Sequence, residues 1–476
     1  MKQVVNNRTK IIATIGPSSS DYQVLREMVI TGVDVVRLNF SHGSHKDHKK
    51  VISNVRKISD ELGVPITILQ DLQGPKIRVG KLDKEQIVLK DGNTLSVTSK
   101  NIIGNQNSIC IDNNVIGDIN IGEKILIDDG KIELKVVSKE DKQLEAIVVR
   151  GGILLERKGV NLPESDIKLS SVTEKDIKDL NFGLKNDVDW IALSFVRSAK
   201  DILELKNLIK DSGYKTKVIA KIEKPQAIKN IDDIIIESDG LMVARGDLGV
   251  EVPMETVPII QKKIVDKCNL ACKPVIIATQ MLESMITSKT PTRAESNDVA
   301  NAVLDGTDAV MLSAESATGK YPLLAVESMS RIINSVEKTS NMIYYKFEKF
   351  KKLRNKLSES LITTACRLSK QINAKAIVTM TKSGYSAYRV SGSRPKARIY
   401  IVTNEKKIGN EVNLVWGIRS IYYNKTENID STLENIEKIL LDNKHLDKGD
   451  KYIITSSMPT HWKGHTNMMK LNVVNS

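Results

Sequence analysis

Residues 217–249 read KVIAKIEKPQAIKNIDDIIIESDGLMVARGDLG, which is a short apolar run, a helical stretch and a second apolar run. The two runs, Lys217 to Ile222 and Leu241 to Ala244, are largely apolar on consecutive rather than alternating positions. This pattern is typical of parallel strands that helices cover on both faces. The stretch therefore predicts one strand–helix–strand unit of an α/β fold.

The same kind of run recurs along the first 340 residues, each time followed by a helical stretch. The six further runs are Lys10 to Ile15, Val33 to Leu38, Ile66 to Leu69, Val188 to Val196, Val275 to Ala278 and Ala309 to Leu312. Eight strand–helix units are the number that closes a (β/α)8 barrel. We therefore expect an α/β protein with a TIM-barrel domain formed by residues 1–74 and 171–340.

Residues 75–170 interrupt the barrel pattern between its third and fourth strands. They contain short alternating segments, such as Gln86 to Leu89 and Lys131 to Val137, separated by turn signals such as Asp129-Gly130. Such segments predict strands in a small all-β domain. Long insertions at loop tips cost little chain entropy, so we expect a β-barrel inserted here as a lid.

The C-terminal part of the chain has a third pattern. A Lys-rich stretch from about Thr339 to Lys356 leads into it. Predicted strands and helices then alternate, at Ser358 to Ile372, Ala376 to Thr379, Ile399 to Thr403 and Tyr452 to Thr455. We expect residues 341–476 to form a separate open α/β domain.

The net charge of +13 belongs to this C-terminal part alone. Residues 1–340 hold 47 basic and 47 acidic side chains, whereas residues 341–476 hold 24 and 11. Only 4% of the chain is aromatic, and no basic run is interleaved with the rings on which single-stranded nucleic acid stacks. The apolar runs are far shorter than the ~18 residues of a membrane-spanning helix. We expect neither a nucleic-acid nor a membrane partner.

The cysteines indicate a reducing compartment. Four cysteines in 476 residues cannot form a disulfide framework, and residues 1–10 carry no apolar signal-peptide core. We therefore expect the protein in the cytoplasm. Cys268 and Cys272 stand four apart on the amphipathic segment Ile259 to Leu270, without a second CxxC pair, and are expected to be buried small hydrophobes.

Ionisable side chains follow the predicted barrel strands, where such barrels build their active sites. Lys221 and Glu223 stand two apart, so they point to the same side of the fifth strand, and Asp247 is expected on the neighbouring strand. The other strand ends carry Arg37 to Gly43, Asp71, Arg245, Thr279-Gln280 and Ser313 to Glu315. Carboxylates beside a lysine and an arginine are what phosphoryl transfer through a divalent metal requires. The alternative is that these charged residues only form structural ion pairs at the mouth of the barrel. Five of the eight strand ends carry ionisable groups, which disfavours this alternative.

Two other patterns are weaker candidates for a site. His42, His45 and His48 are spaced by three residues, yet no Cys or His stands at finger-like spacing, which favours a solvated helix start. The glycines of residues 246–249 do not form G-x-G-x-x-G, and the chain has no P-loop. Any nucleotide must therefore bind in another way.

Seven segments closely resemble the signature sequences of the pyruvate kinase family. They are Arg37 to Gly43, Gly74 to Arg78, Lys158 to Pro163, Ala220 to Glu223, Ala244 to Gly249, Ala278 to Met285 and Pro291 to Glu295. They occur in the family's order, and the resemblance runs from Arg8 to Thr466-Asn467. The lack of an extra domain before Arg8 indicates the bacterial type.

The resemblance implies transfer of the phosphoryl group of phosphoenolpyruvate to ADP, giving pyruvate and ATP in the last step of glycolysis. It also implies a homotetramer. Carried over residue by residue, Glu223 and Asp247 would hold Mg²⁺ or Mn²⁺. Lys221 would neutralise the transferring phosphoryl group and the developing enolate, and Arg37 would bind the substrate phosphate.

The remaining site residues follow from the same resemblance. The backbone of Gly246 and Asp247, with Thr279, would hold the substrate carboxylate, and Thr279 would help deliver the proton. The positions that match nucleotide contacts are Asn39, Phe40, Ser41, His42, Arg78 and Lys158. The lid, with Lys158, would close over the site and exclude water.

Reasoning from the residues alone leaves two other functions open. A metal-dependent barrel lyase that acts on pyruvate-like enolates needs the same carboxylate-bound metal, and only the lid with Arg78 and Lys158 argues for a nucleotide. A non-catalytic binding protein on the same barrel is disfavoured because every acid, base and metal position is filled. One departure from the family is residues 313–316, with Ala and Ser where many members carry Gly and Thr; Glu315 is kept.

The monovalent-cation positions of the family match Asn39, Ser41, Asp71 and the carbonyl of Leu72. Members that need potassium typically carry Glu where this chain has Lys76. An ammonium group near the site can supply the positive potential that K⁺ would supply. We therefore expect that K⁺ is not required.

A phosphate-binding loop is expected just after a predicted strand of the C-terminal domain. Its hydroxyls, glycine turn and lysine are Thr381, Lys382, Ser383, Gly384 and Ser386. The loop resembles the family's effector loop, with Tyr385 where many relatives have Arg. This predicts activation by a phosphorylated allosteric effector of unspecified identity.

Overall fold

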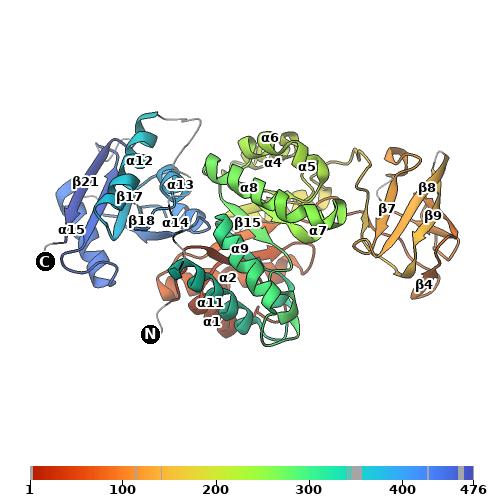
Figure 1. The fold of residues 1–476 in the computed structure, drawn as a ribbon, viewed down its shortest axis with the longest axis horizontal. Helices are drawn as coiled ribbons and strands as arrows, with labels where there is room; N and C mark the ends of the chain where they lie inside the picture. The colour runs from red at the N-terminus through yellow and green to blue at the C-terminus, as the bar shows by residue number, and fades with distance from the viewer. Residues whose placement is uncertain are drawn as a thin grey trace.

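The computed structural model describes residues 4–112, 115–140, 142–339, 341, 344, 356–425, 428–458 and 466–474. The Lys-rich stretch expected after Thr339 lies almost entirely outside the described residues. Three bodies lie in a row: the C-terminal α/β region, the barrel in the middle, and the β-rich insertion (Figure 1). Within the described ranges, none of the helices is both long and apolar enough to span a bilayer.

Eight parallel strands close into a barrel, as the apolar runs predict. In order around the barrel they are β1 (Lys10–Thr14), β16 (Ala309–Leu312), β15 (Val275–Ala278), β14 (Gly240–Ala244), β13 (Lys217–Ile222), β12 (Trp190–Leu193), β3 (Thr67–Asp71) and β2 (Val33–Asn39). Six of these strands are buried at every position. Burial on both faces explains why their sequences are apolar without alternation.

The barrel interior is a packed core. Ile12, Val35, Leu69, Trp190 and Met242, among others, fill it with large side chains. A filled interior leaves only the two ends of the barrel for contacts with other parts of the chain.

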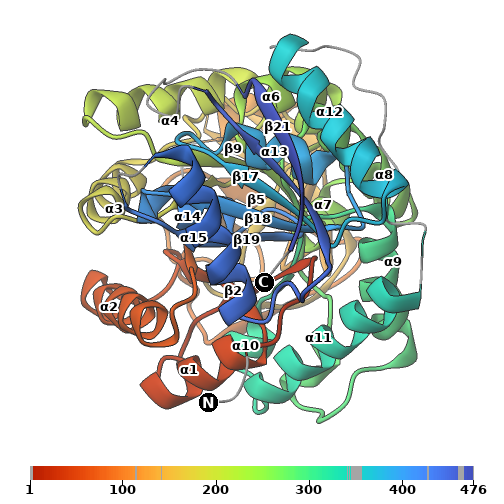
Figure 2. The ribbon, with the colours of Figure 1, turned by 90° about the vertical axis from the view of Figure 1, so that its left-hand side faces the viewer.

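Helices follow the barrel strands, and most of them form a ring around the barrel in Figure 2. They are α1 (Tyr22–Thr31), α2 (His45–Leu62), α3 (Glu174–Lys185), α4 (Ala199–Asp211), α5 (Pro225–Lys229), α6 (Ile231–Glu237), α7 (Arg245–Glu251), α8 (Val257–Ala271), α9 (Arg293–Asp305), α10 (Ala314–Ala317) and α11 (Pro322–Thr339). Capping boxes begin α2 at Ser44, α3 at Thr173 and α9 at Thr292. Each satisfies backbone N–H groups that a helix start would leave unpaired.

The insertion is all-β, as predicted, but its hydrogen bonds form two separate sheets among the described residues rather than the expected closed barrel. One sheet has the order β11 (Val160–Asn161), β7 (Lys124–Ile127), β8 (Ile132–Glu140), β9 (Gln143–Arg150), β5 (Thr94–Thr98) and β6 (Ser108–Cys110); the other pairs β10 (Gly152–Leu155) with β4 (Gln86–Leu89). Gly151 separates β9 from β10 and lies so close to Leu89 that a Cβ there would collide with the Leu89 carbonyl. The chain turns at this glycine and leaves the larger sheet.

The C-terminal region is an open α/β domain, as predicted. Its sheet has the order β19 (Ile418–Tyr422), β18 (Arg398–Thr403), β17 (Ala376–Met380), β20 (Lys451–Ser456) and β21 (Met468–Val473), with β21 antiparallel to β20. Its helices are α12 (Lys356–Gln371), α13 (Tyr385–Gly392), α14 (Lys406–Val412) and α15 (Ile429–Asp442).

This C-terminal domain closes the end of the barrel at which the strands begin. Leu414 packs into the barrel core beside Trp190, and the Trp190 indole N–H donates to the Glu411 carbonyl at 2.9 Å. Thr67, the first residue of β3, donates its hydroxyl to the Asn410 carbonyl at 2.6 Å. The opposite end, where the strands finish, is left for the insertion and the candidate site.

Candidate active site

Lys221 lies at the centre of the polar group where the barrel strands end. Its ammonium nitrogen is 3.0 Å from Glu223 Oε1 and 3.3 Å from Asp71 Oδ1. It also donates to the Ser194 hydroxyl at 2.7 Å. The prediction that Lys221 and Glu223 share one side is confirmed, because the two side chains form a buried ion pair.

Arg37 joins this group through Asp71. Its Nε and Nη2 contact Asp71 Oδ2 at 2.7 and 2.6 Å, and its Nη1 donates to the Thr14 hydroxyl at 2.9 Å. The buried carboxylate of Asp71 therefore contacts two cations, Arg37 and Lys221. A second anion, such as a phosphate, could share these cations.

Burial and neighbouring charges have opposite effects on the pKa values of Lys221, Asp71 and Glu223. Burial alone would lower the pKa of Lys221, but Asp71 and Glu223 outweigh it and raise the pKa, so the ammonium stays charged. Burial also favours a raised pKa for Asp71, yet Lys221 and Arg37 hold this pKa below its usual value. The pKa of Glu223 is raised by burial, opposed by Lys221, and raised further by the nearby charge of Asp247.

Asp247 is near Glu223 but is not on a strand, which corrects the prediction from the sequence. It lies in the first turn of α7, which begins at Arg245 directly after β14 ends at Ala244. The helix starts at the strand end, so the carboxylate reaches the same end of the barrel by a different route.

Gly246 and Thr279 meet at the other side of this helix start. The Gly246 N–H donates to the Thr279 hydroxyl at 2.7 Å, and that hydroxyl donates to the Ala278 carbonyl at 2.6 Å. A Cβ on Gly246 would lie 3.3 Å from the Thr279 oxygen. The contact therefore depends on glycine at this position.

Three residues at two strand ends, after β12 and β15, have strained backbones. Phe195, Thr279 and Gln280 have φ values of 56°, 69° and 56°, a region that residues other than glycine rarely adopt. The Phe195 N–H donates to Glu223 Oε2 at 2.6 Å, which ties one of these turns to a candidate metal ligand. Strain of this kind clusters at functional sites.

The donor set fits a hard divalent cation. Glu223 and Asp247 both offer carboxylate oxygens, and Asp247 is close enough for its charge to raise the pKa of Glu223. In the part of the chain that the structure describes, no group of three or more His, Cys, Asp or Glu residues is arranged as a metal cluster. A metal held here by two carboxylates would complete its shell with water and substrate oxygens, as Mg²⁺ does in phosphoryl-transfer sites.

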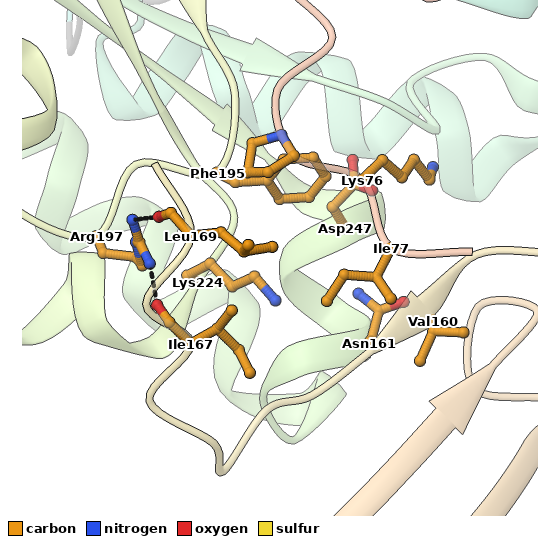
Figure 3. Close-up of a pocket in the computed structure, with 11 residues that line it drawn as sticks. Lys76, Ile77, Val160, Asn161, Ile167, Leu169, Phe195, Arg197, Lys224 and Asp247 are labelled. Carbon is orange, nitrogen blue, oxygen red and sulfur yellow. Dashed lines mark hydrogen bonds between the residues drawn. The ribbon is translucent and has the colours of Figure 1, made fainter. Parts of the chain in front are cut away.

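A pocket opens between the insertion and the barrel (Figure 3). Its lining residues are Pro75, Lys76, Ile77, Val160, Asn161, Ile167, Leu169, Phe195, Arg197, Lys224 and Asp247. Of the two candidate metal ligands, Asp247 lines this pocket and Glu223 does not. Lys224 and Asn161 point toward each other across it.

The nucleotide positions predicted from the sequence fall into two groups. Asn39 is the last residue of β2, and Phe40 to His42 follow it at the barrel end. The Ser41 N–H donates to Asn39 Oδ1 at 3.1 Å. Phe40 is buried and stacks on His48 with ring centroids 4.2 Å apart. Its ring is therefore not exposed to a ligand.

Arg78 and Lys158 lie in the insertion and have partners there. Lys158 is 2.8 Å from Asp128 Oδ1, and Arg78 donates to the Arg157 carbonyl at 2.9 Å. These two cations are on the domain that faces the barrel end, not in the group around Lys221.

The positions proposed for a monovalent cation already carry internal contacts. Asp71 is paired with Arg37 and Lys221, and the Leu72 carbonyl accepts from the Ser194 hydroxyl at 2.7 Å. The alkyl stem of Lys76 lies 3.3 Å from the place where a Cβ on Gly159 would be. Lys76 lines the pocket beside Asp247.

The predicted effector loop forms the turn between β17 and α13. Gly384 has a φ of 76°, and its N–H donates to the Thr381 hydroxyl at 3.0 Å. Lys382 and Ser383 are exposed. Ser386 is buried, and its hydroxyl shares a hydrogen bond of 2.7 Å with that of Thr466.

The other patterns are structural. Glu315 is buried and accepts from the Leu282 and Ser313 N–H groups at 3.2 and 2.7 Å. The predicted helix start near His45 is correct, but His48 is buried rather than solvated. His48 belongs to the inward face of α2, together with Val51, Ile52 and Val55.

The expectation for the cysteines is confirmed. The four cysteines are free and buried. Cys272 is the left-handed residue that ends α8 and not a member of the helix. Burial raises the pKa of its thiol to about 11, which keeps this thiol protonated and unreactive near neutral pH.

Four residues near the site were missed from the sequence. Ser194 follows β12 and accepts from Lys221, so the rule of strand ends could have found it. Arg197, Lys224 and Glu251 are charged residues at the edge of the pocket and beneath it. Their contacts at the site are with residues at least 26 positions away in the sequence, so no local spacing marks these roles.

Family models match most of the chain. The model for the pyruvate kinase barrel domain matches residues 6–326, and the model for the pyruvate kinase alpha/beta domain matches residues 359–472. Among curated relatives, pyruvate kinases of Staphylococcus epidermidis and Agrobacterium vitis are 40% and 41% identical. Each alignment covers 98% of this chain, with 80% and 96% of the relative's length.

A solved structure agrees over almost the same length. A crystal structure of a pyruvate kinase from Cryptosporidium parvum is 35% identical and superimposes with a TM-score of 0.93. The match covers 98% of this chain and 96% of the other. The likeness therefore includes all three bodies of the molecule.

Proposed function

This chain belongs to the pyruvate kinase family, and on that premise we propose that its chemistry is carried by the residues around Lys221. A pyruvate kinase transfers the phosphoryl group of phosphoenolpyruvate to ADP, giving pyruvate and ATP. The observation that carries the assignment is the buried set of Lys221, Glu223, Asp71 and Arg37, with Asp247 beside it.

Lys221 and Arg37 receive the substrate phosphate in this proposal. Both already bind carboxylate oxygens in a buried setting, where preorganised positive charge stabilises developing negative charge more than it would in water. As the phosphoryl group leaves, the enolate oxygen gains charge. The ammonium of Lys221 is placed to neutralise both groups, because it remains protonated.

Glu223 and Asp247 would hold a divalent metal, Mg²⁺ or Mn²⁺. A metal held by these carboxylates would supply Lewis-acid polarisation of the transferring phosphoryl group. Glu223 is held in place by the Phe195 N–H and Lys221, so its orientation is fixed before any ligand arrives. Asp247 is fixed by its place in the first turn of α7.

Thr279 and the start of α7 would bind the substrate carboxylate. The Gly246 N–H points at the Thr279 hydroxyl, and an incoming carboxylate can take over such a donor. The same hydroxyl, which donates to the Ala278 carbonyl, would help deliver a proton from solvent to the enolate carbon by giving up its own proton and taking one from water. Both steps use groups at the ends of β14 and β15.

The nucleotide would lie between the barrel end and the insertion, which serves as a lid. Asn39, Ser41 and His42 would contact it from the barrel through their polar groups, and Phe40 through its backbone. Arg78 and Lys158 would contact it from the lid. Lys158 would exchange its partner Asp128 for a phosphate, which is chemically similar.

Further properties complete the proposal. Residues 1–74 with 171–340, 75–170 and 341–476 form the catalytic, lid and effector domains. A phosphorylated effector would bind at Thr381, Lys382, Ser383 and Gly384; Ser386 would contribute only by releasing Thr466. The enzyme is a homotetramer, acts in the reducing cytoplasm, where its four free cysteines stay reduced, and needs no K⁺.

The test measures pyruvate and ATP when the purified protein is mixed with phosphoenolpyruvate and Mg²⁺, with and without ADP. The proposal predicts equal amounts of pyruvate and ATP and no pyruvate without ADP. Pyruvate release that does not depend on ADP would instead support the lyase alternative.

A further inference from the structure

Glu251 is a buried carboxylate that the reaction itself does not use. It is the last residue of α7, the short helix whose first turn carries Gly246 and Asp247. Its side chain has no exposed surface. A carboxylate that is completely buried is costly unless it is well paired, so its partners are informative.

One oxygen of Glu251 joins the lid to the barrel. Oε1 accepts from the Asn161 side-chain amide at 2.7 Å and also contacts the ammonium of Lys224. Asn161 ends β11 in the lid, whereas Lys224 directly follows Glu223 at the end of β13. Oε2 is buried and has no hydrogen-bond partner within the described ranges. Glu251 Oε1 is therefore the atom at which three parts meet: the lid, the helix α7 that carries Asp247, and the segment after β13 that carries Glu223.

This contact acts on the segment that carries the nucleotide cation. Lys158 stands three residues before Asn161, and β11 is held in the lid sheet by its pairing with β7. The returning linker is fixed separately, because Arg197 donates to the carbonyls of Ile167 and Leu169 (Figure 3). With both ends of residues 161–169 anchored to the barrel, the direction of the strand before Asn161 is constrained.

We propose that Glu251 is a positioning residue that latches the lid, through Asn161, to the helix that carries Asp247. The latch sets the position from which Lys158 and the lid approach the nucleotide, relative to the metal carboxylates. Lys224 contacts the same carboxylate, so buried Glu251 has a cationic partner as well as the Asn161 amide. The effect on turnover rests on the function proposed above for Lys158, whereas the effect on lid mobility does not.

The variant Asn161→Asp tests the latch with almost no change in shape. It replaces the amide donor with a second carboxylate against buried Glu251, so the contact becomes repulsive. Loss of a hydrogen bond to a charged group predicts a rise of about tenfold in the KM for ADP. The KM for phosphoenolpyruvate and the affinity for Mn²⁺ should change by less than about twofold, because the Lys221 group is untouched.

Asn120→Asp is the matched control. Asn120 is an exposed lid residue whose amide also donates to a glutamate, Glu123, at 2.8 Å, but that pair stays within the lid. It should leave both KM values unchanged. Amide hydrogen exchange of residues 158–162, measured without substrates, should become at least several-fold faster in Asn161→Asp and not in Asn120→Asp.

A double-mutant cycle with Asn161→Ala and Glu251→Gln gives an independent check, and the two effects on the KM for ADP should not add. If Asn161→Asp folds and matches Asn120→Asp in both readouts, the latch is refuted. If Glu251→Gln does not fold, the comparison of the two asparagine variants still decides. Faster exchange in a protein that makes no pyruvate would support the latch and refute the proposed function.

Discussion

The two ends of the barrel use buried charge in opposite ways. Where the strands finish, Lys221, Asp71 and Glu223 pair with one another beneath a pocket that reaches Asp247. Where the strands begin, the charges pair with groups of the C-terminal domain that covers them. Arg394 is 3.2 Å from the Asp308 carboxylate, which also accepts from the backbone N–H of Trp416 at 3.0 Å.

The covered end also satisfies backbone groups. The Asn413 amide donates to the carbonyls of Asp34 and Pro65 at 3.0 and 3.1 Å. The guanidinium groups of Arg8 and Arg394 both lie over the Trp416 ring, 5.4 and 4.8 Å from its centroid. Both ends contain the same types of charged residue. Their position, open to a pocket or covered by a domain, therefore decides whether they can take part in chemistry or only stabilise the fold. Paired charges with access to a pocket can exchange partners with a substrate, whereas covered ones hold domains together.

The largest expected effect is at the covered end, with Trp416→Ala. Removing this buried indole leaves a cavity beside the guanidinium groups of Arg8 and Arg394 and should lower the free energy of unfolding by about 3–5 kcal/mol. Urea unfolding measures the loss, and Trp416→Phe, which keeps a ring, should lose clearly less. A loss of kcat per folded molecule, without a loss of stability, would contradict the division between the two ends.

At the open end, Lys221→Met should cut turnover by at least ~10² while folding and metal binding remain, because it removes preorganised charge from the transition state. Steady-state kinetics with a Mn²⁺ binding titration measures both. Lys262→Met, which removes an ion pair with Asp305 on the outer helices, is the control. Near-normal turnover of Lys221→Met would refute the assignment.

Features of the two barrel ends could be predicted from the sequence where they depend on residues close together in the chain. The barrel strands were predictable because burial on both faces leaves consecutive apolar residues. Asp247 was misplaced because a helix that starts directly after a strand has no cap residue to mark it. His48 was taken as solvated, although its spacing to Val51, Ile52 and Val55 marks the inward face of α2.

Long-range pairs could not be predicted from one sequence. Asn161 and Glu251 stand 90 residues apart, and nothing local to either residue indicates the other. The same holds for Leu414, which fills the barrel from another domain. Most candidate residues of the barrel were predicted from the repeating strand ends, although Ser194 was overlooked there. The contact of Asn161 with Glu251 was missed because it depends on how the insertion packs on the barrel.

A smaller effect is expected from pH at the covered end. Burial raises the pKa of Glu411 to about 7, opposed by Lys217 and Lys407 and assisted by Asp189 and Asp239. The folded protein then keeps a proton that the unfolded chain loses above its ordinary pKa of 4.5, so stability falls as pH rises from about 4.5 to 7.

Glu411→Gln should remove this dependence. Relative to the wild type, the variant should gain about 1–3 kcal/mol of stability between pH 5 and pH 8. Urea unfolding at several pH values measures the difference. A constant difference between the two proteins over this range would show that Glu411 titrates normally.

The smallest effect is expected for potassium at the open end. Activity in buffer without K⁺ and Na⁺ should stay within a few-fold of its value with KCl, since Lys76 supplies a fixed positive charge near the site. Lys76→Glu should create a potassium requirement. A wild-type enzyme that is nearly inactive without K⁺, at matched ionic strength, would refute this expectation.

The central claim is that the open end of the barrel holds a divalent metal between Glu223 and Asp247, beside Lys221. The most direct test is anomalous diffraction at the manganese edge, from crystals grown with Mn²⁺, ADP and an unreactive analogue of phosphoenolpyruvate. We predict a metal peak within coordination distance of oxygens from both carboxylates, about 2.0–2.6 Å, with Lys221 contacting the analogue's phosphate. A metal bound elsewhere, with neither Glu223 nor Asp247 coordinating it, would contradict the account.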